Sequence, residues 1–245
     1  MSTDLATTDP KDGALAPVLP GALAQEDLAT LPLTYFRIDH KSGTFQDPDL
    51  GLTTQPPLQG IILGSGKAKF LFANDDDKVP VCKSYDCITG TGKNEAGEEV
   101  QISCATCPYD EFGSIEKLGK VGRGKACRER RHLYVLLKDA EGEWEALPVI
   151  VSVPPASLRN WKKFYGAIAR TRRNTQPSLL DNIVLIGLGK VEGGAKTYHR
   201  TTFTLGGKTP KDIQKIAEQM AVLLAVRNQQ KDMDQALEDQ ESFDK

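Results

Sequence analysis

The sequence lacks several features that would assign it to a common class. It contains no apolar run long enough to span a bilayer, and residues 1–30 have neither the basic nor the apolar stretch of a secretory leader. We therefore expect a soluble, cytoplasmic protein with no membrane partner. Cysteine is absent outside residues 82–127, which excludes a disulfide framework spread over the whole fold.

Catalytic signatures are also lacking. Only three histidines occur, and none belongs to a nucleophile or zinc-protease motif. Gly64–Lys67 resembles part of a phosphate-binding loop, but Gly60 lies one residue too far from Gly66, and Ala68 replaces the required hydroxyl. We predict that the protein is not an enzyme. An enzyme that acts on nucleic acid ranks third among the functions that the sequence suggests, after two non-catalytic ones.

What the sequence does contain is a compact group of cysteines. The five have the spacing Cys82-x4-Cys87-x16-Cys104-x2-Cys107-x19-Cys127. A CxxC turn places two sulfurs on one side of a bend, where both reach a metal at about 2.3 Å, and two further thiolates complete a tetrahedral site. The spacing therefore predicts a zinc ribbon with one structural zinc ion, in preference to two disulfides or a redox pair.

A tetrahedral zinc site has four ligands, so one of the five cysteines is not needed for it. Cys104 and Cys107 form the central pair, and Cys127 has no competitor after it. Cys82 and Cys87 compete for the last position. We favour Cys82, because it ends a strand-like stretch whereas Cys87 lies in a turn-rich loop, and we predict a free thiol at Cys87.

Charge is unevenly distributed, although the formal net charge is only −2. Residues 1–30 carry one lysine against five acidic residues, and residues 231–245 carry two lysines against six, so the body between them is basic. A basic body between acidic ends indicates a polyanionic partner and a tail that competes with it. We predict a flexible acidic arm at 1–30 and a disordered acidic tail at 231–245.

Two basic clusters lie within the body. Residues 117–138 contain eight cations against one acid, and residues 159–173 contain six cations, no acid and interleaved aromatic residues. Cations neutralise phosphates, and aromatic faces stack bases at about 1–3 kcal/mol each, although Trp161 and Tyr165 also fit the core face of a helix. The predicted nucleic-acid-binding residues are Lys125, Arg128, Arg130, Arg131, Arg159, Trp161, Lys162, Lys163, Tyr165, Arg170, Arg172 and Arg173.

Short β-like runs dominate residues 31–230. They include LTYFRI, LQGIIL, AKFLFA, HLYVLLK, NIVLIGLG and TYHRTTFTL, separated by clusters rich in Gly, Pro and Asp. Helical periodicity occurs at 158–168 and again after Thr209 and Pro210, which resemble a cap and a first helical residue. The pattern predicts a mainly β, α+β domain: an OB-like β-barrel with two helices and the zinc ribbon inserted at 80–130.

The run from CKSYD through CATCPYDEFGS and GKACRERRHLYVLL to LPVIVSVPPASLRNWKKF resembles a group of phage and mobile-element proteins. These are predicted single-stranded-DNA-binding proteins with an OB-type barrel and an inserted four-cysteine zinc ribbon. The resemblance covers about residues 80–170, and CATCP with GKAC is its most specific part. It implies Cys82, Cys104, Cys107 and Cys127 as zinc ligands. The group tends to have glycine where this chain has Cys87.

The C-terminal sequence gives a separate indication. Replicative single-strand-binding proteins commonly end in an acidic tail with a near-terminal Phe, and this chain ends in QALEDQESFDK. A tail that only improves solubility is the alternative. The predicted partner-binding residues are Glu238, Asp239, Glu241, Phe243 and Asp244.

Together these features predict a non-catalytic, sequence-tolerant single-stranded-DNA-binding protein of phage or mobile-element replication and recombination. We expect it in the cytoplasm of a bacterium or of a phage-infected host, with one structural zinc ion as its cofactor. Its partners would be single-stranded DNA and, through the tail, replication or recombination proteins; a homo-oligomer is compatible with this. The alternative is a zinc-ribbon regulatory adaptor that binds host transcription or replication machinery.

Overall fold

The computed structural model describes residues 33–47, 50–74, 80–93, 97–171, 178–193, 196–225 and 227. The predicted arm at 1–30 and tail at 231–245 lie outside these residues. The described part is mainly β, with a mixed sheet and two α-helices, which confirms the predicted α+β class. No helix within it is both long enough and apolar enough to cross a membrane.

Most of the strands precede the α-helices along the chain. The strands are β1 (Tyr35–Asp39), β2 (Thr44–Gln46), β3 (Thr53–Thr54), β4 (Leu58–Leu71), β5 (Cys82–Ser84), β6 (Thr89–Lys93), β7 (Glu99–Ser103), β8 (Cys127–Lys138), β9 (Val149–Val153), β10 (Asn182–Gly193) and β11 (Lys196–Lys208). The helices are the 3-10 helices η1 (Ser114–Leu118), η2 (Pro155–Ser157) and η3 (Leu179–Asp181), the α-helix α2 (Leu158–Thr171) and a C-terminal α-helix at 211–225.

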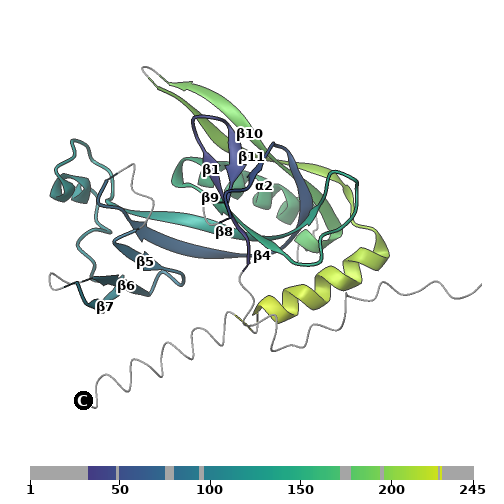
Figure 1. Cartoon of the computed structure of the whole chain (residues 1–245), viewed down its shortest axis with the longest axis horizontal. Helices are drawn as coiled ribbons and strands as arrows, with labels where there is room; N and C mark the ends of the chain where they lie inside the picture. The colour runs from purple at the N-terminus through teal and green to yellow at the C-terminus, as the bar shows by residue number, and fades with distance from the viewer. Residues whose placement is uncertain are drawn as a thin grey trace, which may run out of the picture.

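β4 connects the two parts of the sheet. The strand order is β3-β2-β1-β9-β8-β4-β5-β6-β7, and β10 pairs with both β4 and β11. β8 lies along one side of β4, whereas the other side is occupied by β10 at its start and by β5 at its end. Figure 1 shows β4 and β8 running side by side from the main body towards β5, β6 and β7, the strands of the cysteine segment.

β4 is one continuous strand, whereas the sequence predicted two runs separated at Gly64–Lys67. Its pairing with β8 shifts register between Ile62 and Gly64, and the strand then continues to Leu71. The segment that resembled a phosphate-binding loop is therefore the middle of this strand. Near its start, a Cβ at Gly60 would lie 2.5 Å from the Leu136 carbonyl oxygen, so the backbones approach closely there.

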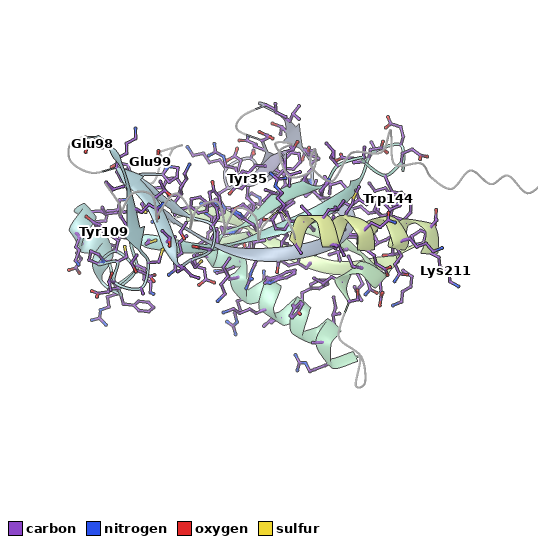
Figure 2. All side chains as sticks on the ribbon, turned by 90° about the horizontal axis from the view of Figure 1, so that it is seen from below. Tyr35, Glu98, Glu99, Tyr109, Trp144 and Lys211 are labelled. Carbon is purple, nitrogen blue, oxygen red and sulfur yellow. The ribbon has the colours of Figure 1, made fainter. Side chains whose placement is uncertain are left out.

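The two α-helices pack on opposite faces of the β4–β8 pair. On the inner face, the buried Trp161 of α2 joins the main core of Leu133, Val135, Val151 and residues from β1, β4 and β10. On the outer face, Ala217, Met220 and Leu224 of the C-terminal helix cover Ile61, Leu63 and Leu136. Strand alternation explains this division, since successive β8 side chains point to opposite faces. Figure 2 shows Trp144, which packs in the second cluster, beside the C-terminal helix.

The sheet curls around the main core without closing among the described residues. Where the β1–β2 turn comes close to β11, two histidines link the segments. Nδ1 of His40 lies 2.9 Å from the carbonyl oxygen of His199, and Nδ1 of His199 lies 2.9 Å from the carbonyl oxygen of His40. The closed barrel of the OB-like prediction is not confirmed.

Candidate metal centre and nucleic-acid-binding surfaces

Cys82 and Cys104 converge over Gly90 of β6, which has no side chain. In the antiparallel β5–β6–β7 sheet, Cys82 pairs with Gly92 and Gly90 pairs with Ile102, two residues before Cys104. The side-chain positions of Cys82, Gly90, Gly92, Ile102 and Cys104 therefore lie on the same face of this sheet. A Cβ at Gly90 would lie 2.9 Å from Sγ of Cys82 and 3.7 Å from Sγ of Cys104. Glycine thus leaves the space in which these thiols meet.

A closed loop brings the last cysteine to the same region. The Tyr109 carbonyl oxygen accepts hydrogen bonds from Ser114 Oγ at 2.8 Å and from the backbone N–H of Cys127 at 2.9 Å. Leu71 of β4 pairs with Cys82 on one side and with Cys127 on the other. Figure 2 shows Tyr109 in this segment, at the opposite end of the molecule from Trp144.

The thiols influence one another electrostatically. Burial raises the pKa of Cys127 to about 12, and nearby Cys107, Asp110, Cys82 and Cys104 raise it further. Burial also raises the pKa of Cys82, with additional contributions from Cys107 and Cys104. The four cysteines of the predicted ligand set therefore lie near one another.

Cys87 has a different environment. Its backbone is left-handed, with φ of 67°, and its N–H donates to Ser84 Oγ at 3.0 Å. Burial raises the pKa of its thiol to about 11, Lys69 lowers it, and Glu129 and Cys104 raise it. Glycine adopts a left-handed backbone without steric cost, whereas a cysteine in this position does so at a cost.

Zinc stays a prediction. All five cysteines are free thiols, and no three His, Cys, Asp or Glu side chains of the described residues are arranged to hold a metal ion. The donor set nevertheless fits, because the thiols of Cys82 and Cys104 meet over Gly90, Cys107 and Cys127 interact electrostatically with Cys82, and a set of four cysteines is typical of structural zinc. Coordination at about 2.3 Å would require the thiolates to draw closer.

The two predicted basic clusters meet at one groove. A cavity of about 460 Å³ lies between α2 and the inner face of β4 and β8, and we call it the α2 groove. Arg131 of β8 lines it together with Trp161, Lys162 and Tyr165 of α2. Lys67 of β4 pairs with Arg131 in the sheet, so its side chain projects from the same face.

The α2 groove has surplus positive charge. Arg131, Lys162 and Lys67 have no acidic partner within the described part of the chain, and Nε of Arg131 is buried there without a hydrogen-bond partner. A buried N–H group favours an acceptor, which a bound anion would supply. Tyr165 is 42% exposed and can stack a base, whereas Trp161 is 4% exposed and belongs to the core.

The other predicted cations are spread over several surfaces. Arg159 and Lys163 are exposed on α2, and Arg170 Nε donates to the Gly166 carbonyl oxygen at 3.0 Å. Lys125 pairs with Asp110 at 3.1 Å in the cysteine segment. The outer face of β8 carries Arg128 and Arg130, and Arg172, Arg173 and the predicted tail residues lie outside the described residues.

Sequence analysis missed two groups of residues. Lys67 was dismissed with the phosphate-loop pattern, although a continuous strand would have placed it beside β8. The sequence reasoning also missed a set of aromatic rings on the outer face of the sheet, formed by Tyr35, Phe70, Phe72, Tyr85 and His132. The alternation in AKFLFA and CRERRH was the available signal.

Comparisons with protein-family models, curated proteins and solved structures give no match for this chain. Its function is therefore inferred from its own residues.

Proposed function

We propose that this protein is a non-catalytic, sequence-tolerant single-stranded-DNA-binding protein that acts in phage or mobile-element replication and recombination. The observation that carries the proposal is the α2 groove, which is lined by Arg131 of β8 and by Lys162 and the exposed Tyr165 of α2, with Lys67 of β4 paired beside Arg131 in the sheet. A cationic groove lined by a stacking ring is the combination that binds a flexible single strand without reading its sequence.

The groove residues have separate roles in this proposal. Lys67, Arg131 and Lys162 neutralise backbone phosphates and release counterions, so affinity falls steeply with salt. Tyr165 stacks on a base, which requires that base to be unpaired. Every base has a π-face, so the stacking tolerates any sequence.

The proposal includes one zinc ion held by Cys82, Cys104, Cys107 and Cys127 in a ribbon inserted into an OB-like domain. Zinc would replace the core that this segment lacks, since only Cys104, Ser114 and Ala126 are among the buried residues between 98 and 126. Metal binding to such a segment contributes directly to its folding.

A second function, the zinc-ribbon adaptor, is favoured by a different observation. The cysteine segment and its flanks expose several apolar side chains to solvent, with Phe112 83% exposed and Val121 fully exposed. Val81, Tyr85 and Ile88 are exposed in the same segment. Apolar residues gathered on one small segment are a feature of protein-binding sites. This observation supports a protein partner for the ribbon, either beside DNA binding or in place of it.

The test is a salt-dependent titration of fluorescent oligo-dT, with duplex DNA and RNA as competitors. We expect the wild type to prefer oligo-dT over duplex. Arg131→Ala and Lys162→Ala should weaken binding and each flatten the slope of log K against log salt by about 0.7. Lys215→Ala is the matched control, because Lys215 is exposed on the C-terminal helix, away from the groove. An adaptor would show neither single-strand preference nor steep salt dependence.

A further inference from the structure

The outer face of the sheet carries a second group of cations, opposite the α2 groove. Strand alternation places Arg130 of β8 on this face while its neighbour Arg131 faces the groove. Arg37 of β1 projects to the same side as Tyr35, and Figure 2 shows Tyr35 on the side of the strands away from α2. β1 lies next to β9, which pairs with β8.

Arg130 is surrounded by rings and other cations. Its guanidinium lies 5.9 Å from the ring centroids of both Phe70 and Phe72, and its Nη1 reaches Ser152 Oγ only at 3.5 Å. Nε of Arg130 is buried without a hydrogen-bond partner in the described part. Burial lowers the pKa of Arg130, Tyr35 raises it, and Arg128 and Arg37 lower it again.

No acidic side chain of the described part pairs with Arg37 or Arg130. A partly buried cation that has no carboxylate partner among the described residues and adjoins two further arginines attracts an anion. Arginine also binds phosphate through a planar fork of donors, which suits a nucleic-acid backbone better than an isolated ammonium group does. These interactions favour a phosphate as the missing partner.

The neighbouring rings indicate what kind of phosphate compound fits. The Phe70 ring is 6.3 Å from that of Phe72 and 5.9 Å from that of Tyr85, so the rings form a continuous row beside Arg130. Phe70 is buried, whereas Tyr85 is 63% exposed. An exposed ring supported by a buried one is a platform for an unpaired base.

We propose that this outer-face cluster, defined as Arg37, Arg128, Arg130, Phe70, Phe72 and Tyr85, is a second nucleotide-binding subsite. Arg37 and Arg130 hold a backbone phosphate of single-stranded nucleic acid, and Tyr85 stacks an unpaired base. The inference rests on the proposed function for its class of ligand, but it uses residues from other elements and the opposite face of the sheet. The protein would then bind DNA on both faces of β8.

The test uses the full chain and changes the exposed Tyr85 and the half-buried Arg37, because a change at Arg130, whose Nε is buried, could disturb folding. Tyr85→Ala should weaken oligo-dT binding by about five-fold or more, and Arg37→Gln should flatten the salt slope by about 0.7. Ultraviolet cross-linking to oligo-dT that contains 5-iododeoxyuridine should label Tyr85 or Phe72, as mapped by mass spectrometry. Lys215→Ala is the control, and circular dichroism checks the fold of each variant.

The possible failures are distinguishable. If the wild type binds no oligo-dT, the proposed function is wrong and the subsite has no ligand. If Lys162→Ala weakens binding but Tyr85→Ala and Arg37→Gln behave like the control, with cross-links only in the α2 groove, the outer-face subsite is wrong and the proposed function stands. If the outer-face variants lose binding to polyglutamate but keep full affinity for oligo-dT, the cluster binds an acidic protein segment, which also overturns the inference.

Discussion

At the residue scale, the cysteines illustrate what spacing alone reveals. The CxxC pattern and the flanking cysteines predict a set of four ligands, and in the structure the thiols of Cys82 and Cys104 meet over Gly90. The left-handed backbone of Cys87 was not predictable from spacing, because φ depends on how the loop after β5 folds. Whether the set binds zinc is a question for experiment.

The zinc prediction separates Cys87 from the other thiols. We expect one zinc per purified chain by elemental analysis, loss of that zinc in Cys104→Ser, and its retention in Cys87→Ser. Cys87→Gly should retain zinc and be at least as stable as the wild type, because glycine removes a left-handed strain of about 1–2 kcal/mol at some entropic cost. Loss of zinc from Cys87→Ser but not from Cys82→Ser would show that the ligand choice is wrong.

His132 gives a prediction for pH dependence. Burial, followed by repulsion from Arg130, lowers the pKa of His132 to about 4, and its Nε2 lies 3.3 Å from the Tyr35 hydroxyl. The unfolded chain protonates first, near pH 6.5. The stability that neutral His132 contributes is therefore complete above pH 6.5 and is lost as the pH falls towards 4, by at most about 3 kcal/mol.

Urea denaturation between pH 8 and pH 4 measures this effect. His132→Gln should flatten the decline in unfolding free energy below pH 6.5, because glutamine does not titrate. At pH 8 His132 is neutral in both the folded and the unfolded state, so the unfolding free energy at pH 8 is the reference for each protein. An equally steep decline in His132→Gln would assign the acid sensitivity to other groups.

At the element scale, the positions of the strands were easier to predict from the sequence than their lengths. HLYVLLK, NIVLIGLG and TYHRTTFTL each fall in an observed strand, LTYFRI overlaps β1, and both helical stripes form helices. The continuity of β4 was missed, because glycines normally weaken strands, whereas here β8 pairs along the whole length. Thr209 was also predicted to cap the C-terminal helix, but its buried Oγ1 has no hydrogen-bond partner in the described part.

The close approach of β4 and β8 at Gly60 is testable. Gly60→Ala would place a Cβ 2.5 Å from the Leu136 carbonyl oxygen and 2.7 Å from Cγ1 of Val135. Overpacking of this kind costs about 1–3 kcal/mol. Gly66→Ala on the same strand is the matched control, because nothing lies within 4 Å of its added Cβ. Equal unfolding free energies for the two variants would contradict the close approach.

The end of α2 carries a prediction about binding. Changing Arg170, Arg172 and Arg173 together to alanine should weaken oligo-dT binding for all sequences. The slope of log K against log salt should flatten by about 0.7 for each phosphate that is no longer neutralised. The double variant Lys211→Ala, Lys215→Ala on the C-terminal helix controls for general loss of charge. Unchanged affinity and slope would remove these three arginines from the binding surface.

At the scale of the whole molecule, charge asymmetry was visible in the sequence, but its placement was not. The basic residues of the body divide between the α2 groove and the outer face because neighbouring β8 side chains point in opposite directions. The linear sequence predicted two basic clusters, at 117–138 and 159–173, but it did not show that strand geometry divides the first of them between the two faces of the sheet. The ring of Tyr85 joins the second patch through the pairing of β5 with β4, and Phe72 joins it because it directly follows β4.

The last prediction concerns the six acidic residues within 232–244, which can mimic a phosphate chain. Without DNA we expect them to compete for the basic body, and bound DNA should release them and free Phe243 for a partner protein. Deleting residues 231–245 should leave the fold intact, because Leu224, the last buried residue of the described part of the C-terminal helix, is retained. Oligo-dT binding should then tighten most at low salt, where electrostatic competition is least screened. Equal low-salt affinity of the truncated and full chains would rule out competition and leave partner recruitment or solubility as the role of the tail.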